Sequence, residues 1–254
     1  MKRLTQLMLL TGLLLFGGSM LAQQELSAKE IIKKADDKTK GEESGIGVMT
    51  MQIVRPDWTR TVQFRTWSKG TESSLTLITS PAKEKGQTFL KRGNEMWNWN
   101  PKISRMIKLP PSLMSQGWMG SDYTNDDILK ESSIVKDYNH ELIGSEEIDG
   151  HECYKIKMIA KEEANVVWGS QVRWIDKKEF MILKAELYDE EDYLIRTEVG
   201  LDMKLMDGRM IPSRMEIIPA EEEGHKTVVI IDEIKFNKPI EDSFFSQQNM
   251  KRVR

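Results

Sequence analysis

Apolar and polar residues alternate with a period of two along most of this 254-residue chain. The clearest alternating runs are Met49–Ile53, Val62–Phe64, Leu75–Leu77, Tyr154–Met158, Val172–Trp174, Tyr193–Val199, Met215–Ile217 and Ile234–Phe236. Such alternation is typical of antiparallel strands with one face in water and one face on an apolar core. In the run Tyr193–Val199, the pattern places Arg196 and Glu198 on the water side. We expect ten or eleven strands in a meander.

Two Asp-Gly pairs indicate where successive strands turn back. Asp149-Gly150 and Asp207-Gly208 each stand between two alternating runs. A pair of this kind between alternating runs is the strongest short-range signal of a β-hairpin. The sequence therefore predicts a hairpin at each of the two pairs.

A helix precedes the first strand. Ser27 and Glu30 have the spacing of a capping box, and apolar residues follow on one helical face: Ile31, Ile32 and Ala35. This pattern predicts a helix over residues 27–38. Shorter helical pieces are expected near 110–117 and 124–131 and over 242–250.

A large antiparallel sheet with one apolar face must cover that face. A closed barrel, a second packed sheet, or a curved incomplete barrel with helices over it would each do so. The few expected helices fit the third arrangement. The predicted fold class is mainly β, with one large curved antiparallel sheet covered by short helices that form a lid. No linker interrupts residues 23–254, which are expected to form a single domain.

The N-terminus has the pattern of a secretory signal. Lys2 and Arg3 precede an apolar core over residues 7–16, and small residues lead to Ala22-Gln23, where cleavage is expected. This core is shorter than the ~20 apolar residues that a membrane-spanning helix needs. Residues 1–22 are therefore interpreted as a cleaved signal peptide, with the mature chain in the periplasm.

Charge and cysteine content exclude several classes of protein. Loss of the two positive charges in residues 1–22 changes the formal net charge from −3 to −5, which argues against nucleic acid as a partner. Cys153 is the only cysteine, so no internal disulfide can form, and its place in a strand pattern predicts a buried apolar residue. The three histidines are scattered, and no catalytic residue, metal site or cofactor is predicted.

The stretch Met96–Leu129 concentrates large soft side chains beside Pro110-Pro111. Methionine and tryptophan on a segment that can hinge suit a surface that receives apolar molecules of variable shape. Asp122 and Thr124 are interpreted as caps of the following helix rather than as catalytic or metal-binding residues.

Three motifs in this region resemble the LolA-like outer-membrane lipoprotein-sorting superfamily, in its broad branch rather than the dedicated carrier. They are Trp97-Asn98-Trp99-Asn100-Pro101, Arg105-Met106-Ile107-Lys108-Leu109-Pro110 and Gly120-Ser121-Asp122-Tyr123-Thr124-Asn125-Asp126-Asp127. The resemblance implies an open barrel with a helical lid, and an apolar cavity that binds acyl chains in the periplasm. The lid-locking arginine of the dedicated carrier matches no position here.

The resemblance implies a carrier that is not an enzyme. Its partners would be an acylated lipoprotein or a phospholipid, an inner-membrane donor complex and an outer-membrane acceptor, and the protein would be a monomer. The candidate lipid-binding residues are Met49, Met51, Ile53, Phe64, Leu75, Leu77, Trp97, Trp99, Met106, Leu113, Met114, Trp118 and Met119. Two alternatives remain open, a lipid-modifying hydrolase and a non-catalytic envelope scaffold.

Overall fold

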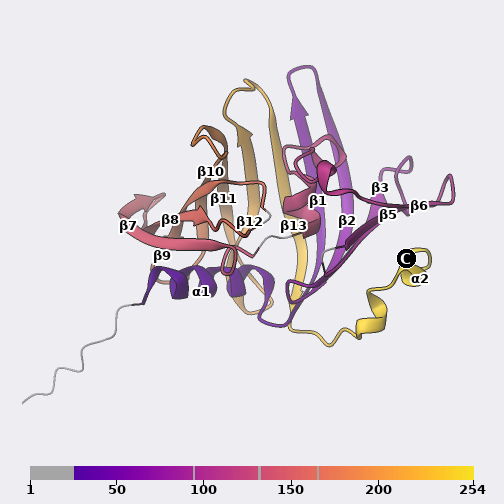
Figure 1. Ribbon diagram of the computed structural model, residues 1–254, viewed down its shortest axis with the longest axis horizontal. Coiled ribbons are helices and arrows are strands. Elements are labelled where there is room, and N and C mark those ends of the chain that lie inside the picture. Colours follow the sequence, from indigo (N-terminus) through magenta and orange to yellow (C-terminus); the bar gives the residue numbers. More distant parts are fainter. Residues whose placement is uncertain (1–25, 94, 131–132, 165) are drawn as a thin grey trace, which may run out of the picture.

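The structure, a computed structural model, describes residues 26–93, 95–130, 133–164 and 166–254. The expected signal peptide and its cleavage site lie outside the described residues. Thirteen strands form one antiparallel sheet that does not close into a barrel (Figure 1). They are β1 (Ser44–Arg55), β2 (Trp58–Lys69), β3 (Ser73–Ser80), β4 (Thr88–Arg92), β5 (Glu95–Asn100), β6 (Arg105–Lys108), β7 (Tyr138–Ile148), β8 (His151–Ala160), β9 (Ser170–Asp176), β10 (Ile182–Tyr188), β11 (Leu194–Met206), β12 (Arg209–Pro219) and β13 (Lys226–Phe236). The predicted fold class is confirmed.

The strand order explains how the sheet is covered. It runs β6-β5-β4-β3-β2-β1-β13-β12-β11-β10-β9-β8-β7, so two strands that follow each other in the sequence form the two opposite edges. The connection between them therefore crosses the sheet, and we call its described residues, 109–130 and 133–137, the strap. The prediction of ten or eleven strands was too low. Short strands such as β6 carry too few residues to show the alternation, and β7 is exposed along most of its length.

Both predicted hairpins are confirmed. Asp149 and Gly150 join β7 to β8 with φ values of 48° and 81°, and Asp207 and Gly208 join β11 to β12 with φ values of 46° and 81°. Positive φ at both central residues is the geometry of a type I′ turn, whose twist matches that of the flanking strands.

Helix α1 (Ala28–Lys40) confirms the predicted N-terminal helix. Ser27 and Glu30 form the complete capping box, because each side chain accepts a hydrogen bond from the backbone of the other residue. The predicted apolar face packs on strands β7, β8 and β9, where the buried partners are Tyr138, Ile156, Met158 and Ile175. This helix covers one half of a sheet face that we call the inner face (Figure 1).

The strap covers the other half of the inner face. Its regular pieces are short: η1 (Pro111–Leu113), η2 (Trp118–Gly120) and the π-helical η3 (Asp126–Lys130). They lie within or beside the two expected helical pieces near 110–117 and 124–131. Among the described residues, no helix is both long enough and apolar enough to span a membrane.

The opposite, outer face also carries an apolar cluster, which the C-terminal segment covers. The expected helix over 242–250 is instead two short pieces, η4 (Asp242–Phe244) and α2 (Gln247–Met250). Phe245 leaves the helical conformation between them, and its buried ring packs with Met250 on strands β2 to β4. Both faces of the sheet are therefore apolar in part, and the period of two does not say which one holds a ligand.

The expectation for β11 was wrong. Arg196 and Glu198 belong to the buried side of this strand, whereas Ile195 on the other side is exposed. The two charged residues are buried because they form an ion pair with each other and because Arg196 also pairs with a carboxylate of the strap. The alternation correctly predicted the position of this strand, but it assigned the buried side to water, because that side carries a buried ion pair.

Candidate functional site

Trp118 of the strap is the centre of the apolar contact with the inner face. Its side chain is fully buried, and its ring packs edge-on against Phe64 at 5.3 Å and Phe89 at 5.5 Å between ring centroids. The surrounding cluster comes from seven strands (β1 to β5, β12 and β13) and the strap, and includes Met51, Ile53, Val62, Ile78, Met114, Ile217 and Val229. In this arrangement the side chains of the strap cover the apolar surface of the inner face.

The sequence-derived candidates for lipid contact divide between the two faces of the sheet. Eight belong to the cluster under the strap: Met49, Met51, Ile53, Phe64, Leu113, Met114, Trp118 and Met119. Five lie in the outer-face cluster beneath the C-terminal segment: Leu75, Leu77, Trp97, Trp99 and Met106. The structure therefore brings the first group together and separates it from the second by the thickness of the sheet.

An arginine of β1 fixes the strap at its middle. Arg55 donates two hydrogen bonds from separate guanidinium nitrogens to the two carboxylate oxygens of Asp122, at 3.0 and 3.1 Å. It also donates to the carbonyl oxygen of Gly120 at 3.0 Å. Thr227 of β13 adds a hydroxyl that donates to Asp122 at 2.7 Å and accepts from its backbone N–H at 2.9 Å. Asp122 is thus an anchor rather than the predicted helix cap.

Thr124 is the cap, as predicted. Its hydroxyl accepts a hydrogen bond from the backbone N–H of Asp127 at 3.1 Å, and the Asp127 carboxylate accepts from the backbone N–H of Thr124 at 2.7 Å. This reciprocal pair is a capping box in which aspartate replaces the usual glutamate. The second carboxylate oxygen of Asp127 accepts a hydrogen bond from the indole N–H of Trp168 at 2.9 Å.

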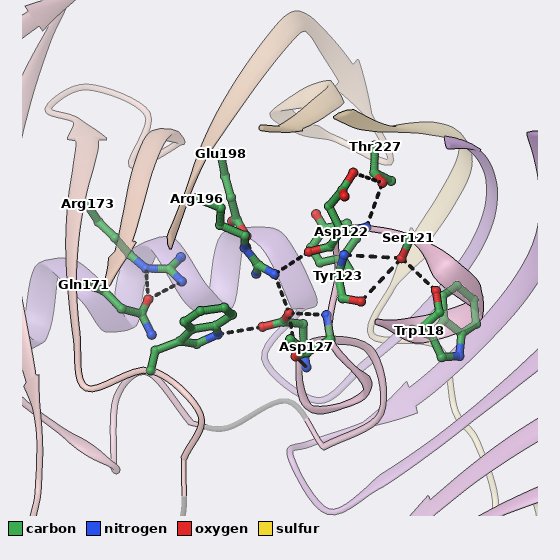
Figure 2. Close-up of polar contacts among 12 residues, drawn as sticks. Trp118, Ser121, Asp122, Tyr123, Asp127, Gln171, Arg173, Arg196, Glu198 and Thr227 are labelled. Carbon is green, nitrogen blue, oxygen red and sulfur yellow. Dashed lines mark hydrogen bonds and ion pairs between the residues drawn. The ribbon is translucent and has the colours of Figure 1, made fainter. Parts of the chain in front are cut away.

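A second arginine fixes the strap to β11 (Figure 2). Arg196 donates to the Asp127 carboxylate at 2.7 Å, to the Asp122 carbonyl at 2.8 Å and to Glu198 at 2.6 Å. Its guanidinium also lies over the Tyr123 ring, with 5.3 Å between the guanidinium carbon and the ring centroid. The ion pair is buried on both sides.

Burial and charge act in opposite directions on this pair. Burial alone would raise the pKa of Asp127, but the Arg196 guanidinium and the hydrogen bonds from Trp168 and Thr124 hold that pKa below its usual range. Burial likewise acts to lower the pKa of Arg196, yet the Glu198 and Asp127 carboxylates raise it above the ordinary value. Both side chains are therefore charged at neutral pH.

These two arginines were not identified from the sequence. Arg55 stands 67 positions before Asp122, and Arg196 stands 69 positions after Asp127, so no local spacing relates the partners. The one signal in the sequence was the position of Arg196, a charged residue within the alternating run Tyr193–Val199.

The lone cysteine lies outside the strap region. Cys153 is buried on the outer face, as predicted, and burial raises the pKa of its thiol to about 11. In the part of the chain that the structure describes, no three His, Cys, Asp or Glu side chains are grouped so that they could hold a metal ion.

A comparison with known proteins adds a family and a fold. A family model whose description reads "Uncharacterized protein" matches residues 70–252. A LolA superfamily protein from Nitrosomonas europaea is similar at 26% identity, with a TM-score of 0.77 over 89% of this chain and 100% of that chain. A search of curated proteins finds no match.

Two further solved structures show the same fold. A DUF1329 family protein from Desulfovibrio piger has 23% identity and a TM-score of 0.79 over 88% of this chain and 97% of that chain. A domain from Vibrio parahaemolyticus, named for outer membrane lipoprotein sorting, has 21% identity and a TM-score of 0.78 over 89% of this chain and 98% of that chain. The resemblance to the LolA-like superfamily is confirmed.

Proposed function

The chain belongs to the family whose model matches residues 70–252, and from its LolA-like fold we propose that it is a periplasmic carrier that shields acyl chains beneath the strap. The observation that supports this proposal most directly is the burial of Trp118. A fully buried indole from an irregular strap, packed on Phe64 and Phe89, occupies the place that an acyl chain would take.

The energetics of such a carrier follow from exchange of one apolar contact for another. An acyl chain in water is unfavourable by ~0.8 kcal/mol for each methylene, so it must be transferred into an apolar site. The empty site must in turn be covered, and Trp118 and Met114 of the strap do this in the closed form. The free energy of closure limits how tightly the lipid is held, and therefore allows its release.

The composition of the cluster suits a cargo of variable shape. Six methionines contribute flexible thioether side chains to this cluster: Met49, Met51, Met96, Met114, Met119 and Met215. Such side chains adapt to different chains at little cost, because they are unbranched and polarizable. We propose an acylated lipoprotein or phospholipid as cargo, a donor at the inner membrane and an acceptor at the outer membrane.

The remaining parts of the proposal concern the chain as a whole. We propose that residues 1–22 are a cleaved signal peptide and that residues 23–254 are one lipid-binding domain, which acts as a monomer in the periplasm. Support for export comes from the basic and apolar pattern of the first sixteen residues.

A capture experiment distinguishes the carrier from its alternatives. Delipidated protein is mixed with a labelled phospholipid or a labelled palmitoyl peptide and then separated by size. We expect stoichiometric capture with the label recovered chemically unchanged. Release of a cleaved product would instead support the hydrolase, and the absence of both capture and cleavage would support the scaffold.

The position of the lipid is tested with brominated acyl chains, which quench nearby indole fluorescence on contact. Trp118→Phe should remove part of the quenching, because Trp118 lies in the proposed site. Trp174→Phe is the matched control, because Trp174 is equally buried but lies on the outer face. Equal loss of quenching in both variants would place the lipid elsewhere.

A further inference from the structure

A small cavity lined by both polar and apolar side chains adjoins the apolar cluster under the strap. It has a volume of about 160 Å³ and lies between the last turn of α1, the strap and strands β9 to β11. Its lining includes Arg173, Arg196, Gln171, Tyr123, Glu198 and Asp127.

The strand register explains why these side chains share one face of the sheet. Arg173 of β9 and Glu198 of β11 both stand directly opposite Ala185 of β10. Side chains opposite each other on neighbouring strands point to the same face of the sheet. The central residue of this row, Ala185, is buried in a cluster with Trp168, and the Arg173 and Glu198 side chains on its two sides both line the cavity. Figure 2 shows Arg173 beside Gln171 and Glu198 beside Arg196.

Some hydrogen-bond donors around this cavity have no acceptor among the described residues. The Nε atom of Arg196 is buried, and no described residue accepts a hydrogen bond from it. The Tyr123 hydroxyl makes no hydrogen bond within the part of the chain that the structure describes. Arg173 donates twice to the side-chain oxygen of Gln171, and no described carboxylate lies within ion-pair distance of it.

The carboxylates that line the cavity are already bonded. Asp127 and Glu198 both accept from Arg196, and Asp36 pairs with Lys40 at 3.0 Å. Among the described residues, the hydrogen-bonding groups of this cavity that have no partner are therefore donors, and the Arg173 guanidinium forms no ion pair with a described carboxylate. A single carboxylate matches this set, because two arginines and a hydroxyl can donate to its oxygens and one negative charge neutralises Arg173.

Tyr123 connects this cavity to the apolar cluster. Its ring packs against the cluster that contains Trp118 and Phe64, while the residue also lines the cavity. A ligand with its carboxylate beside Arg173 would therefore direct its chain past Tyr123 to the surface that Trp118 covers. We propose that the cavity is a head-group site for the carboxylate of a long-chain fatty acid. This inference rests on the proposed acyl-chain carrier and adds a free fatty acid to the two cargo classes proposed above.

The experiment compares three ligands of equal chain length on the delipidated full-length protein: palmitate, methyl palmitate and hexadecanol. We expect palmitate to bind at least about tenfold more tightly than the other two, the effect of one charge-assisted contact. Arg173→Gln should remove this preference and leave methyl palmitate unchanged, and Arg173→Lys should restore part of it. Tyr123→Phe should weaken palmitate alone.

The control variant is Arg65→Gln, because Arg65 lies on the outer face over Trp67 and should not affect any ligand. Equal affinities for the three ligands, or a palmitate preference that survives Arg173→Gln, would overturn the head-group site but leave the carrier. Displacement of palmitate by equal concentrations of acetate would assign the cavity to small carboxylates and would also overturn it. If none of the three ligands binds, both the head-group site and the proposed carrier fail.

Discussion

Arg55 of the sheet and Asp122 of the strap form a two-pronged ion pair, with nitrogen–oxygen distances of 3.0 and 3.1 Å and little exposure of either side chain. This geometry matches the planar guanidinium to the planar carboxylate, which makes it one of the stronger polar contacts in proteins. The pair holds the middle of an otherwise irregular segment against the apolar inner face. Its integrity should therefore decide whether the strap is closed.

Removal of one partner of this pair should open the strap. Asp122→Asn leaves the Arg55 guanidinium without its counter-charge, and breaking a buried pair in this way costs about 3–5 kcal/mol. Hydrogen exchange should become faster for the backbone amides of residues 109–130, while those of the sheet remain protected. Mass spectrometry of exchanged peptides measures both regions in one experiment.

Lys69→Gln is the matched control for that variant. Lys69 forms an ion pair with Asp242 of the C-terminal segment, and both side chains are exposed in large part. Its loss should change stability by less than about 1 kcal/mol and leave the exchange of the strap unaltered. Unchanged exchange in Asp122→Asn would mean that apolar packing alone keeps the strap closed.

The buried pair of Asp127 and Arg196 should make the strap resistant to mild acid. The pKa of Asp127 is held below its ordinary value of 3.8, chiefly by Arg196 acting against the effect of burial. A carboxyl whose pKa is lowered on folding stabilises the fold fully above its unfolded pKa, and this stabilisation is lost as the pH falls through the folded value. The near-ultraviolet circular dichroism should therefore stay constant down to about pH 4. A transition of the strap at pH 5 to 6 would contradict this assignment.

The Cys153 thiol should be unreactive in the folded protein. Burial raises its pKa to about 11, above the ordinary value of 9.0, so the thiolate is scarce at pH 8. A raised pKa means that the contribution of this group to stability is present below pH 9 and is lost as the pH rises towards 11. Reaction with an aromatic disulfide reagent should be slow in buffer and complete in urea. Rapid reaction in buffer would show that strand β8 opens locally.

The sheet could be predicted from the sequence because its signals are local. Alternation located most strands, and the Asp-Gly pairs located two hairpins whose φ values require such residues. The identity of the two edges could not be predicted, since it depends on β13 pairing with β1 across most of the chain. That long-range pairing is what sends the strap across the inner face.

The candidate site was predicted only in part, for a related reason. The alternation of strand β5 correctly separates Met96 from Trp97, but it does not say that Met96 faces the strap and Trp97 the C-terminal segment. The anchors Arg55 and Arg196 were missed because their partners are remote in the sequence. Arg196 was even assigned to the water side, since no single-sequence pattern reveals a buried ion pair.

A reversible covalent lock on the strap tests the central claim most directly. The backbone N–H of Asp122 lies 2.9 Å from the hydroxyl oxygen of Thr227, so these two positions are in direct contact between the strap and β13. The pair Asp122→Cys and Thr227→Cys is introduced into a Cys153→Ala background, and formation of the bond is confirmed by mass spectrometry.

Capture of a labelled palmitoyl lipid is then compared before and after reduction of this bond, with the Cys153→Ala protein treated in the same way. If acyl chains bind beneath the strap, the oxidised protein should capture no lipid and the reduced protein should capture one equivalent. Equal capture in the two states would contradict the account, because it would show that lipid binds without movement of the strap.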